Sequence, residues 1–145
     1  MAAINPPPIL KFSILLIILF VVEFSEANIF NPPVNVTIFN RVELPSHPTT
    51  FTVYCQSKDN DLGFHTIPFT GFYEFSFSPD VFGRTLYFCS FTWPGNPHRH
   101  YLDIYDGKHD GCHTCTWLIN VNGGCLNDHK CGPWKSIQLI DAINE

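Results

Sequence analysis

The sequence predicts an all-β fold, a small antiparallel β-sandwich of about eight strands held together by disulfides. Short runs of residues alternate between apolar and polar, which is the period of a half-buried strand. The chain is also rich in aromatic residues, with 14 Phe, 5 Tyr and 3 Trp, and these suit a pleated surface. Its six cysteines are an even number, which in a small exported domain is typical of three disulfides.

The first 27 residues predict a secretory signal peptide. Ile14–Val22 is an unbroken apolar run, and Ser25 and Ala27 place small residues at the −3 and −1 positions of a cleavage site. The run ends at Glu23, short of the roughly 20 apolar residues that span a bilayer. We therefore expect cleavage after Ala27. Residues 28–145 would then form a single domain that is secreted to the extracellular space and does not insert into a membrane.

The charge of the chain argues against nucleic acid as a partner. Residues 28–145 carry a net charge of −4. The whole chain carries −5, and the leader accounts for −1 of it through Lys11, Glu23 and Glu26. Lysine and arginine form no cluster or stripe along the sequence. A nucleic-acid-binding domain needs such a basic patch.

Eight strands are expected, each bounded by turn signals rich in Pro, Gly, Asn or Asp. The run 84–93 is expected at the centre of a sheet because apolar residues occupy both of its faces, and Pro68 weakens the run 64–69 because it removes a backbone donor. The expected strands are Val34–Val42, Phe51–Gln56, Phe64–Phe69, Gly71–Phe77, Arg84–Trp93, Tyr101–Tyr105, Cys115–Val121 and Trp134–Ile140.

Alternation assigns one face of these strands to the core. Along the chain, the residues expected to face inward are Val34, Val36, Ile38, Phe51, Val53, Cys55, Tyr73, Phe75, Phe77, Tyr87, Cys89, Phe91, Trp93, Leu102, Ile104, Trp117, Ile119 and Val121. Turns are expected where prolines, glycines and polar residues gather, at residues 43–49, 94–97, 106–113, 122–124 and between Cys125 and Cys131.

The stretch Cys55–Gly63 predicts a polar turn that follows a strand ending at a cysteine. Its acidic residues resemble the start of a calcium loop. An EF-hand beginning at Asp59, however, requires an oxygen ligand, a glycine and a glutamate at its fifth, sixth and twelfth positions. The sequence has Gly63, Phe64 and Thr70 there. We expect a β-turn in which Asp and Asn side chains bond local backbone amides.

The cysteines are expected to be structural. They are Cys55, Cys89, Cys112, Cys115, Cys125 and Cys131, and six cysteines allow 15 pairings among which spacing does not choose. The C-x-x-C pair Cys112/Cys115 would need a helix start beside a βαβ unit to act as a redox site. Zinc bound by the last four cysteines with His113 or His129 is the other alternative, but secreted cysteines oxidise first.

No pattern predicts catalysis or a cofactor. The sequence lacks a G-x-S-x-G elbow, and its acidic residues form no pair that spacing singles out for glycoside hydrolysis. Asn35-Val36-Thr37 is an N-glycosylation acceptor. Asn35 falls on the polar face of its expected strand, so we expect a glycan there.

Several motifs together resemble the plant self-incompatibility protein S family, whose members are also called S-protein homologues. They cover nearly the whole of residues 28–145, in order. The matching segments are Val36–Asn40, Cys55–Gly63, Phe82–Cys89, Phe91–Trp93, Asp103–Tyr105 and Cys115–Trp117.

The resemblance implies a small, secreted, disulfide-bonded and often glycosylated β-sandwich without enzymatic activity. Founding members of this family are pistil-secreted ligands that trigger rejection of self pollen through a pollen membrane receptor. Many members have four cysteines, so Cys125 and Cys131 resemble an added pair that forms a local bridge. The resemblance leaves the partners of the other four undecided.

Two functions follow as hypotheses. The first is a signalling ligand for a membrane receptor, with specificity in exposed polar loops. The best candidate is the loop that carries Asp106, Lys108, His109 and Asp110, and residues 94–100 come next. The alternative is a secreted defence or carbohydrate-binding module, in which Trp93 or Trp134 would stack on a sugar.

Overall fold

The computed structural model describes residues 5, 7–30 and 32–135, with the backbone alone over 22–30. The chain divides into two units, Met1–Pro32 and Pro33–Glu145. The first contains the helix α1 (Pro8–Phe30), which includes the apolar run of the expected signal peptide. Among the described residues, no helix has both the length and the hydropathy needed to cross a bilayer. Cleavage after Ala27 remains a prediction.

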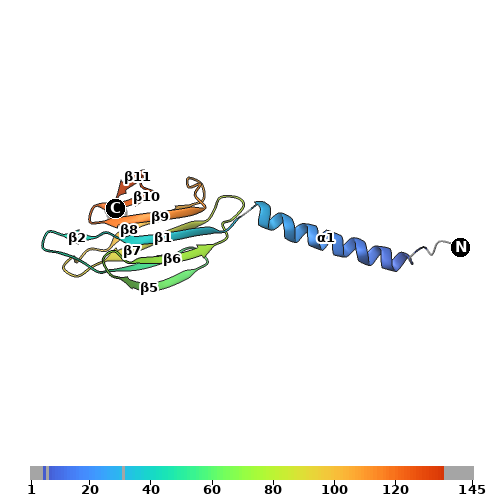
Figure 1. The fold of residues 1–145 in the computed structure, drawn as a ribbon, viewed down its shortest axis with the longest axis horizontal. Coiled ribbons are helices and arrows are strands. Elements are labelled where there is room, and N and C mark those ends of the chain that lie inside the picture. The colour runs from blue at the N-terminus through green and yellow to red at the C-terminus, as the bar shows by residue number, and fades with distance from the viewer. Residues whose placement is uncertain (1–4, 6, 31, 136–145) are drawn as a thin grey trace, which may run out of the picture. The chain divides into compact units, whose positions relative to one another are not determined.

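The second unit is a sandwich of two β-sheets, as predicted (Figure 1). One sheet has five strands in the order β11-β10-β9-β1-β6, and the other has four in the order β5-β4-β7-β8. The strands are β1 (Val34–Asn40), β4 (Phe51–Gln56), β5 (Asp61–Ile67), β6 (Phe72–Phe77), β7 (Leu86–Thr92), β8 (His100–Asp106), β9 (Thr114–Asn120), β10 (Gly123–Leu126) and β11 (Lys130–Pro133). A two-residue hairpin of β2 (Glu43–Leu44) and β3 (His47–Pro48) lies within the turn expected at 43–49.

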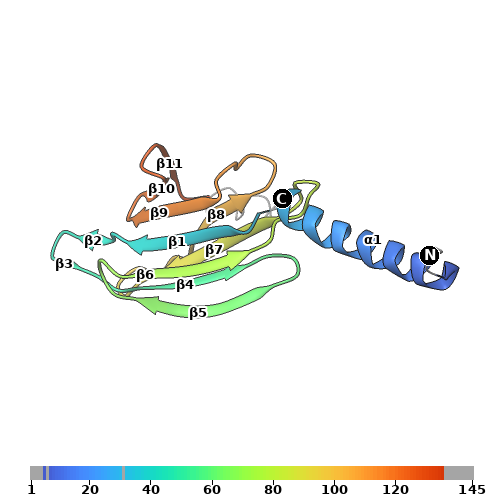
Figure 2. The ribbon, with the colours of Figure 1, turned by 45° about the vertical axis from the view of Figure 1, so that its right-hand side comes forward.

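Alternation located the core correctly. The predicted inward residues of β1, β4, β7 and β8 are buried, and Tyr73, Phe75 and Phe77 of β6 pack against the same cluster. β7 lies inside its sheet between β4 and β8. The two inner faces therefore form one continuous apolar core between the sheets, whose strands can be followed in Figure 2.

One strand pair departs from the antiparallel arrangement that was predicted for the sandwich. β1 and β9 run parallel, with Asn35 beside Thr114, whereas all other described pairs are antiparallel. β8 lies at the edge of the four-stranded sheet. The chain crosses from there to the five-stranded sheet, where β9 pairs with β1. Local alternation contains no information about such a crossing, because it records which residues are buried and not the direction of a neighbour.

The end of the described chain also differs from the prediction. The segment between Cys125 and Cys131 is a tight hairpin of β10 and β11, in which these two cysteines face each other. Asn127 and Asp128 have φ angles of 49° and 61°, the left-handed conformation that Asn and Asp tolerate in turns. The strand expected at 134–140 is absent at Trp134 and Lys135, and its remaining residues lie outside the described part.

The predicted disulfides are present. They join Cys55 to Cys89, Cys112 to Cys115 and Cys125 to Cys131, so the pairing implied for Cys125 and Cys131 is the one observed. All six cysteines are therefore bridged, and the zinc alternative loses its thiolate ligands.

A buried asparagine joins three segments at one end of the sandwich. Asn40 is fully buried and its Nδ2 donates to the carbonyls of Thr49 (2.8 Å) and Ile67 (2.9 Å). Its Oδ1 accepts from the N–H of Val42 (2.8 Å). Asn40 thus links the end of β1 to the 42–49 segment and to the end of β5.

We predict that Asn40→Ala lowers the free energy of unfolding by about 2–4 kcal/mol, because it leaves three buried backbone groups without partners. Urea denaturation of the unglycosylated protein measures this change. Asn35→Ala, at an exposed position of the same strand, is the matched control and should stay within about 0.5 kcal/mol of the unchanged protein. Equal losses in the two variants would contradict the role given to Asn40.

Candidate functional site

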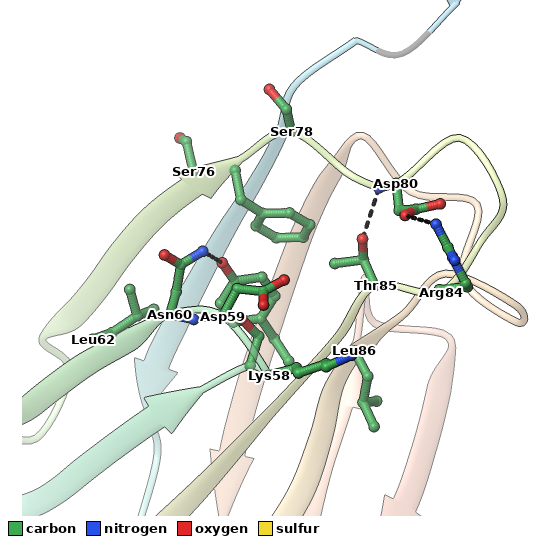
Figure 3. Close-up of a pocket in the computed structure, with 13 residues that line it drawn as sticks. Lys58, Asp59, Asn60, Leu62, Ser76, Ser78, Asp80, Arg84, Thr85 and Leu86 are labelled. Carbon is green, nitrogen blue, oxygen red and sulfur yellow. Dashed lines mark hydrogen bonds and ion pairs between the residues drawn. The ribbon is translucent and has the colours of Figure 1, made fainter.

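A cleft of about 700 Å³ opens at one end of the sandwich. Three segments line it, residues 57–62, 76–78 and 80–87. Figure 3 shows Asn60 and Leu62 on one side, Ser76 and Ser78 on another, and Asp80, Arg84 and Thr85 on a third. Two of these segments are motifs that carry the family resemblance, Cys55–Gly63 and Phe82–Cys89.

The turn that forms the first wall is shorter than predicted. It spans Ser57–Asn60, where the Ser57 N–H donates to the Asn60 carbonyl (2.8 Å) and the Asn60 N–H donates to Ser57 Oγ (3.1 Å). The Asn60 side chain reaches across the sheet and donates to the Tyr87 hydroxyl (3.1 Å). This bond fixes the turn against β7, at the floor of the cleft.

The second half of the predicted turn belongs to β5. Asp61 accepts hydrogen bonds from the Tyr54 hydroxyl (2.6 Å) and from the Gly63 N–H (2.9 Å), and these bonds lower the pKa of the Asp61 carboxyl. The same contact raises the pKa of the Tyr54 hydroxyl. Gly63 has a φ of 74°, and the β4–β5 register shifts here. The acidic motif therefore forms a β-bulge at the beginning of β5.

The loop after β6 forms the third wall, and Asp80 organises it. Asp80 accepts from the Phe82 N–H (2.6 Å) and pairs with the Arg84 guanidinium (2.8 Å), while its own N–H donates to Thr85 Oγ1 (2.7 Å). The Arg84 guanidinium also lies 5.1 Å from the centre of the Phe82 ring. These bonds present Val81 and Phe82 at the loop tip, 66% and 77% exposed.

The predicted receptor-binding loop packs against this third wall. The backbones of the two loops approach closely at Gly83 and Gly107. A side chain at position 107 would crowd this contact, because its Cβ would lie 3.0 Å from the Gly83 carbonyl oxygen. Within the 106–110 loop, Asp110 accepts from the Asp106 N–H (2.6 Å) and Asp106 accepts from the Lys108 N–H (3.0 Å). These two carboxylates hold the loop's shape, and Lys108 and His109 are exposed at its tip.

Some polar groups around the cleft are not used by the fold. The side chains of Lys58, Asp59 and Ser78 are exposed and have no hydrogen bond or ion pair within the described residues. Beneath them, the rings of Phe77 and Tyr87 pack with centroids 4.4 Å apart. The cleft thus combines an aromatic floor with a polar rim, which suits recognition by hydrogen bonds and apolar contact.

The tryptophans proposed for carbohydrate stacking belong to the core. Trp93 is buried, and Trp134 donates from Nε1 to the Val121 carbonyl (2.9 Å). His100 packs between the two indoles, with centroids 4.6 and 4.9 Å away. Burial of the His100 ring lowers its pKa. The buried Trp93 indole therefore presents no open face to a sugar ring, and Trp134 is partly buried against the same aromatic cluster.

The remaining predicted positions do not line the cleft. Asn35 is exposed on β1, and its Oδ1 accepts from the Ser76 hydroxyl. Cys55 and Cys89 are fully buried in the core. Among the described residues, no three His, Cys, Asp or Glu side chains gather into a group that would hold a metal ion.

Comparison with protein families and solved structures gives consistent matches. A model of the family described as plant self-incompatibility protein S1 matches residues 35–138. A solved structure of SPH (Self-Incompatibility Protein Homologue) proteins, described as a widespread family of small, highly stable, secreted proteins from plants, superposes with a TM-score of 0.50 and 20% identity, over 72% of this chain and 96% of that one. It therefore shares the fold.

Curated relatives come from Arabidopsis thaliana. S-protein homolog 29 is 35% identical over 134 residues, covering 86% of this chain and 95% of the relative. S-protein homolog 5 is 42% identical over 88 residues, covering 58% of this chain and 67% of the relative. S-protein homolog 3 is 37% identical over 98 residues, covering 59% and 64%. The chain thus spans about two thirds of the length of homologs 5 and 3.

The Asp80 contacts predict how the loop that carries Phe82 responds to pH. Bonds from Arg84 and from the Phe82 N–H lower the pKa of Asp80 below its ordinary value of 3.8. Because the pKa of Asp80 is lowered, the loop keeps these bonds at pH values above the ordinary pKa of the carboxyl. It loses them as the pH falls through the lowered pKa.

An NMR titration of the carboxyl carbons should find Asp80 titrating below 3.8, and Arg84→Ala should move its pKa part of the way back, since the Phe82 N–H remains. Asp61, whose pKa is lowered by the Tyr54 hydroxyl and the Gly63 N–H and not by Arg84, serves as the control, and its pKa should be equally lowered in both proteins. An Asp80 pKa that Arg84→Ala leaves unchanged would contradict the assigned contact.

Proposed function

The chain belongs to the plant self-incompatibility protein S1 family, and from this membership we propose that it is a secreted, non-enzymatic signalling ligand that binds a cell-surface receptor. Pollen recognition, or a related form of signalling between plant cells, is the proposed setting. The receptor would be a membrane protein of the target cell.

Three features support secretion. The leader has the apolar run and the small residues of a signal peptide. Three disulfides are typical of proteins folded in an oxidising compartment. The SPH proteins that share this fold are described as secreted.

One observation carries the proposed receptor binding: two loops at the cleft end are fixed by internal bonds and still present exposed side chains. The 106–110 loop exposes Lys108 and His109, and the 79–85 loop exposes Val81 and Phe82. Ordering these loops costs little on binding because their shapes are already set. An exposed phenylalanine beside basic residues also has the chemistry of an interface hot spot.

The structure refines which residues of the predicted loop are proposed to touch a partner. Asp106 and Asp110 accept backbone and side-chain bonds inside the protein, including an ion pair of Asp110 with Lys130 (3.6 Å). Replacing them would change the loop's shape as well as its charge. Lys108 and His109 are therefore the residues proposed for direct contact.

We predict that the double variant Lys108→Glu/His109→Ala binds receptor-bearing membranes at least about tenfold more weakly, because it reverses one charge and removes one ring at the contact. Binding of the labelled protein to plasma-membrane vesicles measures this change. Arg41→Glu makes the same charge reversal at an exposed position beyond the far end of β1 and should bind as the unchanged protein does. Unchanged binding by the double variant, with an unaltered circular dichroism spectrum, would exclude this loop.

Processing provides a separate test of the proposed secretion. Protein collected from the medium of plant cells that express the full chain should begin at Asn28 and carry a glycan that Asn35→Gln removes. Intact-mass measurement before and after enzymatic deglycosylation reads out both features. Retention of the uncleaved chain inside the cell would contradict secretion.

A further inference from the structure

The outer edge of β6 carries backbone groups without a strand partner. In β1, the N–H of Asn35 donates to the carbonyl of His113, just before β9 (2.8 Å). The N–H of Asn40 donates to the Gly71 carbonyl, just before β6 (2.9 Å). Odd-numbered residues of β1 therefore bond to β9 and even-numbered ones to β6. By the β1–β6 register, the residues of β6 that bond to β1 are Tyr73, Phe75 and Phe77.

It follows that the alternate residues of β6 point their N–H and C=O groups away from β1. These residues are Phe72, Glu74 and Ser76. β6 lies at the end of its sheet, and within the described part of the chain no strand pairs with this side. Their side chains are exposed on the outer face of the sheet. The edge thus offers three donors and three acceptors at strand spacing.

The other sheet edges have features that discourage pairing. β5 is bulged at Gly63, and the Leu62 carbonyl bonds the His65 ring (2.7 Å). On β8, the Tyr101 carbonyl accepts from the Lys135 N–H (2.9 Å). β11 has only four residues, with a lysine at one end and Pro133 at the other. β6 has six residues in unbroken register, without a bulge, lysine or proline.

The free edge leads directly into the cleft. Near the turn that joins β5 to β6, the His65 ring stacks on Tyr73 with centroids 4.0 Å apart, so the two strands are close there. Towards the other end, Leu62 of β5 and Ser76 and Phe77 of β6 line the cleft, and Figure 3 shows Leu62 and Ser76 on different sides of it. A strand laid along the second half of β6 would therefore have open space beneath it rather than packed side chains.

We propose that β6 is a docking edge, to which an extended segment of a partner protein adds as a sixth strand with alternate side chains entering the cleft. Its backbone would satisfy the open groups of Phe72, Glu74 and Ser76. Glu74 is the single charged residue of this edge, so the segment would place a lysine or arginine opposite it. A second copy of this chain fits poorly, because full antiparallel overlap would set Glu74 against Glu74.

The geometry can be tested first in the free protein by amide hydrogen exchange measured with NMR. The N–H groups of Phe72, Glu74 and Ser76 should exchange at least about a hundredfold faster than those of Tyr73, Phe75 and Phe77, since only the latter are in the ladder. Equal protection of the two sets would show that the edge is already covered and would overturn the proposal.

The binding test uses random ten-residue peptides displayed on phage, panned against the unchanged protein. We expect enriched peptides to alternate apolar and polar residues and to contain a lysine or arginine. Glu74→Pro removes the outward N–H and is tolerated at an edge strand, whereas Glu74→Ala keeps it and serves as the matched control. The synthetic form of an enriched peptide should bind Glu74→Pro at least about tenfold more weakly than Glu74→Ala.

Two further readouts keep the test decisive. Glu74→Lys should shift the enriched peptides from basic to acidic at one position, and bound peptide should slow amide exchange at Phe72, Glu74 and Ser76. Failure to enrich any peptide, equal binding by Glu74→Pro and Glu74→Ala, or protection confined to other residues would each overturn the proposal.

This inference deepens the proposed receptor binding and rests on it only for the identity of the partner. Peptide binding should survive Lys108→Glu/His109→Ala, because these residues lie outside the β6 edge. If Glu74→Pro binds peptide poorly but binds receptor-bearing membranes normally, β6 docks a different partner and receptor binding stands. If peptide binding fails while the loop variant still loses membrane binding, the docking edge alone is wrong.

Discussion

The Cys55–Cys89 disulfide is the constraint on which the shape of the cleft depends. The two cysteines are fully buried and face each other across β4 and β7, with Cα atoms 4.1 Å apart. The bridge fixes the register of the two central strands of the four-stranded sheet. One of these strands leads into the Ser57–Asn60 turn and the other begins beside Thr85, so the positions of two cleft walls follow from one covalent bond. A crosslink of this kind contributes about 3 kcal/mol, mainly by restricting the unfolded chain.

Around this bond the protein separates residues that hold structure from residues that are free to bind. Asp61, Asp80, Asp106 and Asp110 use their carboxylates on nearby backbone and side-chain donors. The exposed side chains near them, such as those of Lys58, Phe82 and Lys108, make few contacts within the protein. Rigid loops that present exposed side chains are the kind of surface through which the proposed partner would be recognised.

The alternation of apolar residues was enough to predict the sandwich, because it records which face of a strand meets the core. It could not reveal the parallel β1–β9 pair or the β10–β11 hairpin, since strand direction depends on distant segments and Gly123–Pro133 has weak strand propensity. The motif Cys55–Gly63 was recognised, but Asp61 looked like a turn residue because Asp and Gly favour turns and bulges alike. The cleft itself escaped prediction because three segments far apart in the sequence form it. The roles of Asp106 and Asp110 were hidden in the same way: an Asp-Gly pair predicts a turn, but not whether its carboxylate faces the turn or the solvent.

We propose that recognition is concentrated at the cleft end of the sandwich. Hydrogen–deuterium exchange of the mature protein, with and without receptor-bearing membrane vesicles, tests it over the whole fold in one measurement. We expect slowed exchange at residues 57–60, 72–85 and 106–111, and no change in the 94–100 turn at the opposite end. Protection confined to residues 94–100, with the cleft end unchanged, would contradict it.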